Sequence, residues 1–119
     1  MKYVSKLDFY EYIRCVLSIS INQWERIPGK EYDIDKMHQI AIEKYRARYK
    51  DMVTLILSYD GSDFVMEVEF DDEKGVFYEV PMPENHKEEI KSNYDFLLDG
   101  IRNNQEKKLD KKLVDIFNI

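Results

Sequence analysis

The sequence predicts an α+β domain: a three-stranded antiparallel β-meander flanked by two N-terminal and one or two C-terminal helices, in the order ααβββαα. Residues 52–80 alternate apolar and polar side chains with a period of two, which is typical of strands. Turn residues interrupt this block at Asp60-Gly61 and at Gly75. The segments on either side repeat apolar residues at helical spacing. Strands that follow one another in a single block favour an antiparallel sheet.

Length and composition indicate one globular domain, residues 1–119, with 44% apolar and 35% charged residues. The net charge of −6 disfavours binding to duplex nucleic acid, because that affinity comes mainly from neutralised phosphates. The single cysteine, Cys15, cannot form an internal disulfide. The longest uncharged run, Cys15 to Trp24, contains polar residues, so we expect neither a signal peptide nor a membrane span. We expect a cytoplasmic protein. Its abundance of Lys, Ile, Asn, Asp and Tyr is common in AT-rich bacteria and their mobile elements.

The first helix is predicted from about Lys6 to Arg26. Residues 5–8 have the form of a capping box with Asp8 in place of Glu, and Pro28-Gly29 ends the helix. The apolar stripe comprises Phe9, Ile13, Val16, Leu17, Ser20 and Trp24. The β-branched residues between Val16 and Ile21 leave a strand as the alternative for that piece.

The second helix is predicted from Ile34 to Asp51, capped by Asp33 or Asp35. Its apolar residues recur at helical spacing, while charged residues occupy the other side. The stripe comprises Ile34, Met37, Ala41, Tyr45, Tyr49 and Met52.

Two strands, Met52–Tyr59 and Phe64–Phe70, are predicted to form a hairpin with a type I′ turn at Asp60-Gly61. A two-residue turn would pair apolar residues on one face, which we expect to be the core face. These pairs are Leu57 with Phe64, Leu55 with Met66, and Val53 with Val68. The other face would pair Ile56 with Val65 and Thr54 with Glu67. A third strand is predicted over Val76–Val80, with Val76, Tyr78 and Val80 on the core side.

The C-terminal part is predicted to contain a helix that begins at Glu84 or Asn85 and ends near Gly100. Its inner stripe comprises Ile90, Tyr94, Leu97, Leu98 and Ile101. Residues 102–108 form a polar joint, and Leu109, Leu113, Ile116 and Phe117 suit a short last helix.

No pattern of residues indicates catalysis, so we expect a protein that is not an enzyme and holds no cofactor or metal. His38 and His86 lack the spacing of metal ligands. The four glycines form no phosphate-binding loop, and no serine lies in a nucleophile elbow. A catalytic role would require a buried carboxylate beside one of the histidines.

The preferred hypothesis is a binding protein that docks a protein partner through the face of the sheet opposite the core. An apolar centre ringed by acids on this face suits a partner with a basic surface. These residues are Ile56, Val65, Phe77, Glu67, Glu69 and Glu79. An inhibitor, an immunity protein or an adaptor, monomeric or weakly dimeric, would fit. In the competing interpretation, a helix covers this face and the acids only keep it soluble.

The alternative hypothesis is RNA binding or gene regulation. Residues 44–50 interleave cations and aromatic residues, a mixture that can stack bases and hold phosphates. The candidate residues are Lys44, Arg46, Arg48, Lys50, Lys107 and Lys108. On the predicted helix Tyr45 and Tyr49 face the core, which weakens this hypothesis.

Overall fold

The computed structural model describes residues 2–3, 7–28, 30–33, 38–41, 43–59, 64–85 and 87–118. Its two helices are α1 (Phe9–Ser18) and α2 (Lys87–Phe117), and its short 3-10 turns are η1 (Ile21–Gln23) and η2 (Asp71–Glu73). The strands are β1 (Lys2–Tyr3), β2 (Glu25–Ile27), β3 (Lys30–Asp33), β4 (His38–Ala41), β5 (Glu43–Tyr49), β6 (Val53–Tyr59), β7 (Phe64–Phe70) and β8 (Tyr78–Glu79).

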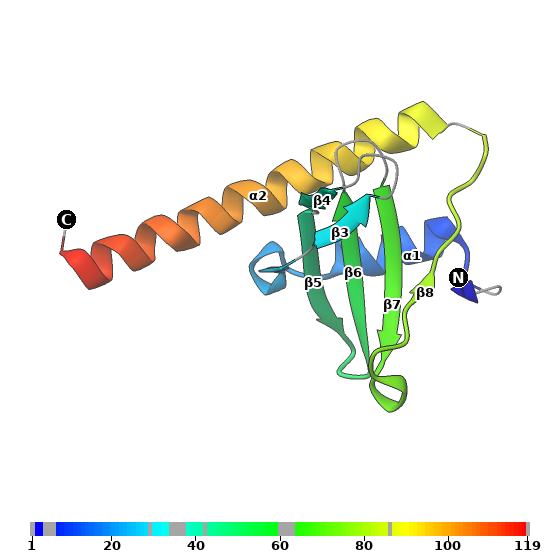
Figure 1. The fold of residues 1–119 in the computed structure, drawn as a ribbon, viewed down its shortest axis with the longest axis horizontal. Helices are drawn as coiled ribbons and strands as arrows, with labels where there is room; N and C mark the ends of the chain where they lie inside the picture. The colour runs from blue at the N-terminus through cyan, green and yellow to red at the C-terminus, as the bar shows by residue number, and fades with distance from the viewer. Residues whose placement is uncertain are drawn as a thin grey trace.

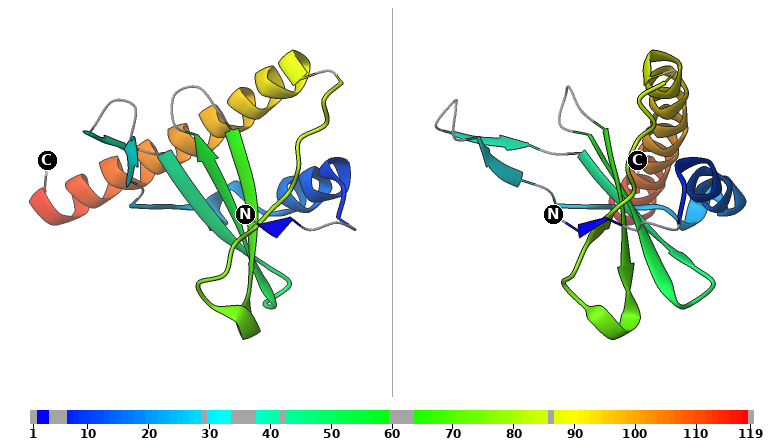
Figure 2. Two further views of the ribbon diagram at one scale, coloured as in Figure 1. Left: turned by 45° about the vertical axis from the view of Figure 1, so that its right-hand side comes forward. Right: turned by 90° about the vertical axis from the view of Figure 1, so that its right-hand side faces the viewer.

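An α+β fold results, in which α1 and α2 both lie on one face of a twisted sheet (Figures 1 and 2). The strand order is β1-β8-β7-β6-β5-β2, with β1 parallel to β8 and every other pair antiparallel. The pair β3 and β4 forms a separate hairpin that projects from the opposite side of the sheet (Figure 2). The sheet is therefore larger than the predicted three-stranded meander.

The predicted meander exists as β6, β7 and β8, but the predicted register is wrong by two residues. Tyr59 pairs with Phe64, so Leu57 faces Met66 and Leu55 faces Val68. Because side chains alternate along a strand, a displacement of two residues keeps each side chain on its expected face. The predicted turn at Asp60-Gly61 lies outside the described residues.

The third strand is shorter than predicted. The turn η2 and the bend that follows it occupy residues 71–75, and only Tyr78 and Glu79 pair with β7. Gly75 has a φ of +84°, which glycine adopts readily, and the chain reverses there. Val80 is buried on the core face, as predicted, and its amide donates to the carbonyl of Met66.

The predicted second helix, Ile34–Asp51, is wrong. The described parts of that segment are strands: β4 and β5, followed by a tight turn. Residues 34–37 and 42 lie outside the described residues. In β5, Tyr45 and Ala47 are buried whereas Arg46 and Arg48 are exposed, which is a period of two. Residues four apart share a side in a helix and also share a face in a strand, so the stripe could not separate the two structures.

The first helix is shorter than predicted. Asp8 caps it by accepting a hydrogen bond from the Glu11 amide at 2.8 Å, and Ile19 is already extended. Beyond it the chain forms η1 and the edge strand β2, which pairs with β5. Backbone pairing with β5 and the low helix propensity of the β-branched residues Ile19 and Ile21 together explain why the helix does not reach Arg26.

The C-terminal region is one continuous helix, so the predicted joint at residues 102–108 is wrong. Its polar residues have partners: Gln105 Nε2 and Lys108 Nζ donate to the Trp24 carbonyl at 2.7 and 3.2 Å. Gly100 lies inside the helix instead of ending it. A β-carbon there would lie 3.2 Å from Ile21 Cδ1, so the glycine allows η1 to approach α2 closely.

The core fills the space between the two helices and the sheet. The fully buried side chains at its centre are large: Trp24, Tyr12, Tyr45, Tyr94, Leu57, Met66, Leu98, Ile101 and Val16. The Tyr12 hydroxyl lies 3.2 Å from the Ile56 carbonyl oxygen and 2.9 Å from that of Glu67. The Tyr94 hydroxyl lies 3.4 Å from the carbonyl oxygens of Ser58 and Val65. Burial raises the pKa of both phenols, so they remain neutral donors.

An ion pair fastens α2 to the sheet. Arg102 Nε and Nη2 each donate to a carboxylate oxygen of Glu43 at 2.6 Å, and Nη1 donates to Asp99 at 2.7 Å. The hydrogen bonds from Arg102 lower the pKa of Glu43. The Tyr45 hydroxyl also donates to Glu43, and burial together with this bond raises the pKa of Tyr45 to about 12. These contacts are structural, because they join two packed elements.

Candidate functional site

The face of the sheet that points away from α1 and α2 is the outer face. Neither helix covers it (Figure 2). Strand pairing places one row of side chains across it: Glu25, Arg46, Ile56, Glu67 and Glu79, on β2, β5, β6, β7 and β8. Two neighbouring rows contain Arg48, Thr54 and Glu69, and Lys44, Ser58 and Val65.

The outer face brings together the acidic candidates and three of the basic candidates. The acidic candidates Glu67, Glu69 and Glu79 lie on β7 and β8, and all three are half-buried. The cations Lys44, Arg46 and Arg48 lie on β5 because that segment is a strand, in which alternate residues share a face. From one edge of the sheet to the other, the outer face therefore carries Glu25 on β2, cations on β5 and acids on β7 and β8.

The predicted apolar centre is mostly covered by its neighbours. Ile56 is only 3% exposed, and Val65 is half-buried. Phe77 is 43% exposed, and Lys44 Nζ lies 6.0 Å from the centroid of its ring. Because Lys44 and Phe77 flank opposite sides of the β6–β7 pair, this cation–π contact spans the outer face. Phe77 is thus the aromatic candidate that solvent reaches.

Two ion pairs hold the arginines in place. Arg46 Nε donates to Glu25 Oε1 at 2.6 Å, and both side chains are more than half exposed. Arg48 forms two parallel bonds with Asp71, at 2.5 and 2.6 Å, and a third with the Thr54 hydroxyl at 3.1 Å. The Arg48 bonds lower the pKa of Asp71. Both guanidinium groups are consequently oriented before any ligand arrives.

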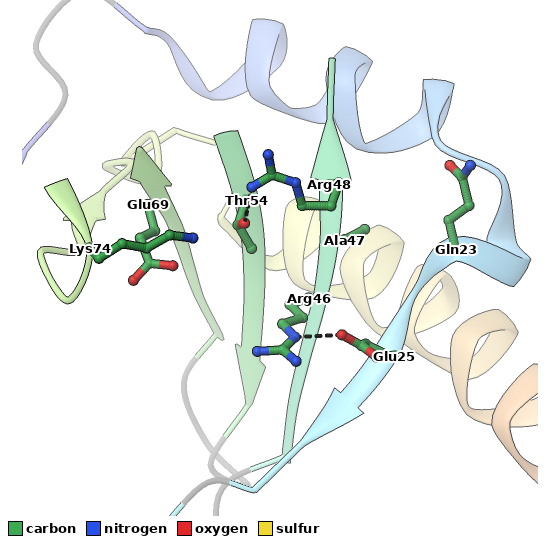
Figure 3. Close-up of a pocket in the computed structure, with 8 residues that line it drawn as sticks. All are labelled: Gln23, Glu25, Arg46, Ala47, Arg48, Thr54, Glu69 and Lys74. Carbon is green, nitrogen blue, oxygen red and sulfur yellow. Dashed lines mark hydrogen bonds and ion pairs between the residues drawn. The ribbon is translucent and has the colours of Figure 1, made fainter. Parts of the chain in front are cut away.

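A shallow cavity of about 240 Å³ lies between these groups (Figure 3). Its lining contains three cations and two carboxylates, together with Gln23, Ala47 and Thr54; the charged residues are Arg46, Arg48, Lys74, Glu25 and Glu69. Glu69 is fixed by the turn that follows its strand, because its Oε2 accepts a hydrogen bond from the Gly75 amide at 2.9 Å. The cavity offers fixed charges of both signs, which suits charged and polar side chains of another molecule.

The remaining basic candidates lie elsewhere. Lys50 lies in the turn after β5, with its Nζ 5.3 Å from the centroid of the Tyr49 ring. Lys107 and Lys108 belong to α2, on the helical side of the sheet, and Lys108 Nζ donates to the Asn22 and Trp24 carbonyls. The two basic clusters of the RNA hypothesis therefore lie on different sides of the molecule.

Sequence reasoning missed the contributions of Gln23, Glu25 and Lys74 to this face. Glu25 was expected on a helix, and Lys74 in a polar turn with no assigned role. The usable signal was the alternation of charged and apolar residues from Lys44 to Tyr49, which is compatible with a strand.

The described part of the chain contains neither a cluster of metal ligands nor a helix that could span a membrane. No group of three or more His, Cys, Asp or Glu residues there is arranged to hold a metal ion. His86 and the side chain of His38 lie outside the described residues. None of the described helices combines the length and the apolar composition that a membrane span requires.

Comparison with known proteins adds no relative. No protein-family model matches the chain, and no curated protein or solved structure resembles it significantly.

Proposed function

We propose that this protein is a non-catalytic binding protein that docks a protein partner through the outer face. The supporting observation is a sheet face that neither α1 nor α2 covers, with its charges separated by strand. A sheet face with an exposed aromatic side chain and oriented charges has the features of an interface, in which charge steers the partner and the aromatic residue anchors it. An inhibitor, an immunity protein or an adaptor would use such a surface.

The expected partner differs from the one that the sequence suggested. A purely basic partner suits Glu67, Glu69 and Glu79, but the β5 side of the face carries Lys44 and Arg46. A complementary partner presents basic groups toward β7 and β8 and acidic groups toward β5. Such a two-sided pattern also selects one orientation of the partner, because the reversed orientation would bring like charges together.

RNA binding is less well supported. Arg46 and Arg48 are already engaged with carboxylates, and an RNA phosphate would have to compete with Glu25 and Asp71. Tyr45 is fully buried, so it cannot stack on a base.

The test uses a photoreactive phenylalanine analogue at Phe77, introduced in cells of the native host. We expect one covalent protein adduct at Phe77. The matched control places the same analogue at Phe96, which is 82% exposed on α2, in the layer on the opposite side of the sheet. Adduct formation at Phe77 alone would assign the contact to the outer face.

A second variant ties the adduct to the charges. Glu79→Lys replaces the like-charged pair Glu67–Glu79 with an opposite pair, so the fold should not weaken. We expect it to reduce the adduct at least fivefold. The proposal fails if Phe77 yields no protein adduct, if Phe96 yields the same one, or if the adduct is removed by ribonuclease. The last outcome would favour the RNA hypothesis.

A further inference from the structure

The C-terminal part of α2 extends beyond the rest of the fold (Figure 1). Gln105 and Lys108 donate hydrogen bonds to the Trp24 carbonyl, and every residue from 109 to 118 is exposed. We call residues 109–118 the overhang. At 1.5 Å per residue it is about 15 Å long. A helical end of this length has little stability in water without tertiary packing, so a bound partner would be needed to hold it firmly.

One side of the overhang is apolar. Leu109, Leu113 and Ile116 are four and three residues apart and so share a side of the helix, and Phe117 adjoins them. These four side chains are between 37% and 72% exposed. A contiguous exposed apolar stripe is a candidate interaction surface.

The stripe is arranged for a second copy of the same helix running in the opposite direction. When two overhangs are paired antiparallel about Leu113, Leu113 of one copy faces Leu113 of the other. Leu109 of each copy then faces Phe117 of the other, so apolar residues meet at both ends of the paired segment. This self-complementarity is what a two-fold interface requires.

Charge favours the same arrangement. Lys107, Lys108, Lys111 and Lys112 occupy the start of the overhang and the turn before it, whereas Asp115 lies toward its end. An antiparallel pair places Lys107 and Lys108 of the two copies at opposite ends of the contact. A parallel pair would align the lysine-rich turns of the two copies and repel.

We propose that this protein forms a two-fold dimer through antiparallel pairing of the overhangs. Figure 1 shows the end of α2 extending past the sheet, so we expect the two globular parts of such a dimer to lie at opposite ends. We expect the outer faces of both copies to remain accessible. A dimer would therefore present two copies of the docking face described above.

Two other occupants of the stripe are less favoured. An apolar groove of about 290 Å³ between α1 and α2, lined by Tyr10, Leu17 and Leu97 among others, could receive the overhang of another copy. That contact joins two different surfaces and does not by itself close into a dimer. An anionic membrane surface would favour cations on both edges of the stripe, but Asp110 lies at one edge.

Sedimentation equilibrium of the full chain, from 2 to about 200 μM, tests the proposal. We expect a monomer–dimer equilibrium whose dissociation constant rises at least tenfold in Leu113→Asp. Both side chains changed in the comparison are exposed, so folding is not at risk. The matched control, Leu17→Asp, changes a 65% exposed leucine of the groove and should leave the equilibrium unaltered.

Disulfide trapping in a Cys15→Ser background tests the direction. We expect Leu113→Cys to form a covalent dimer, and a mixture of Leu109→Cys and Phe117→Cys chains to form the mixed dimer in preference to either homodimer. The proposal is overturned if the chain stays monomeric at about 200 μM or if Leu17→Asp weakens the dimer. It is also overturned if Leu109→Cys chains form a disulfide with each other in preference to the mixed dimer. Finally, it is overturned if monomers bind phosphatidylserine vesicles and Leu113→Asp abolishes that binding.

Discussion

The two faces of the sheet are built from the same strands and differ in how they are buried. In β6, residues 54–58 are all buried, with Leu55 and Leu57 facing the helices and Thr54, Ile56 and Ser58 on the outer face. The core face is closed by apolar side chains from α1 and α2. The outer face is not under either helix, and long charged side chains from β5 and β7 flank β6 there.

The core face therefore provides most of the stability, whereas the outer face is the one proposed to bind a partner. Apolar packing fixes the core face in one arrangement, because a void there would lose dispersion contacts. The ion pairs of the outer face orient its side chains but add little to stability, because exposed ion pairs contribute less than about 1 kcal/mol each. The same central strand therefore supports a packed apolar layer on one side and a charged surface on the other.

The largest expected effect on stability comes from truncating two adjacent residues of β6, one on each face of the sheet. Leu57→Ala should lower the free energy of unfolding by about 3–4 kcal/mol, because it leaves a cavity in the packed core. Ile56→Ala should lower it by about 2 kcal/mol, because flexible charged side chains and water can fill the space. Urea denaturation measures both values. Equal losses of unfolding free energy in the two variants would mean that both faces of the sheet are packed to the same extent.

The second prediction compares an ion pair beneath α2 with one on the outer face. Glu43→Gln should cost about 2 kcal/mol at pH 7, since it weakens charge-assisted bonds from a largely buried Arg102. Glu25→Gln, which breaks the exposed pair with Arg46, should cost less than about 0.5 kcal/mol.

The Glu43 effect should also depend on pH. Its pKa is lowered in the folded state from the ordinary value of 4.5, so its contribution is present above that pH. The contribution is lost as the pH falls through the folded-state value. Chemical denaturation from pH 7 to pH 3 should show the difference between wild type and Glu43→Gln shrinking below about pH 4.5. A difference that grows with acidification would contradict the assigned ion pair.

The smallest expected effect concerns the turn that joins β5 to β6, where the two faces meet. Lys50 and Asp51 have φ values of 55° and 53°, and the Met52 amide donates to the Tyr49 carbonyl, as in a type I′ turn. Asp51→Gly should stabilise the fold by about 0.5 kcal/mol, because glycine adopts positive φ without strain. Asp72→Gly, in η2, serves as the control and should not stabilise. A loss of stability in Asp51→Gly would show that the carboxylate has a structural role.

The sequence predicted the class of fold and the faces of β6 and β7, because alternation over seven residues specifies both. The register was not predictable, since two pairings displaced by two residues place equally apolar partners on the core face. The turn at Lys50-Asp51 has neither Gly nor Asn, so nothing marked the boundary between β5 and β6. Without that boundary, residues 34–51 were consistent with a helix.

The candidate site was predictable in part. The acidic residues on β7 and β8 were placed on the correct face because their strands were predicted. The sequence did not predict that the cations on β5 share a face with the acids on β7, because it predicted a helix for their segment. Glu25 and Lys74 reach the site through the edge strand and a turn, and their positions follow from tertiary structure alone.

The hydroxyl groups of Tyr12 and Tyr94 have a consequence for how the strands align. Each lies within hydrogen-bond distance of two carbonyl oxygens whose residues are paired between β6 and β7. The Tyr12 hydroxyl contacts the pair Ile56 and Glu67, and the Tyr94 hydroxyl contacts the pair Ser58 and Val65. In the alternative pairing, slipped by two residues, Ile56 would face Val65, and neither hydroxyl would reach both of its acceptors. The tyrosines of α1 and α2 therefore favour the observed register of β6 and β7 over the register slipped by two residues, although the apolar pattern alone permits both.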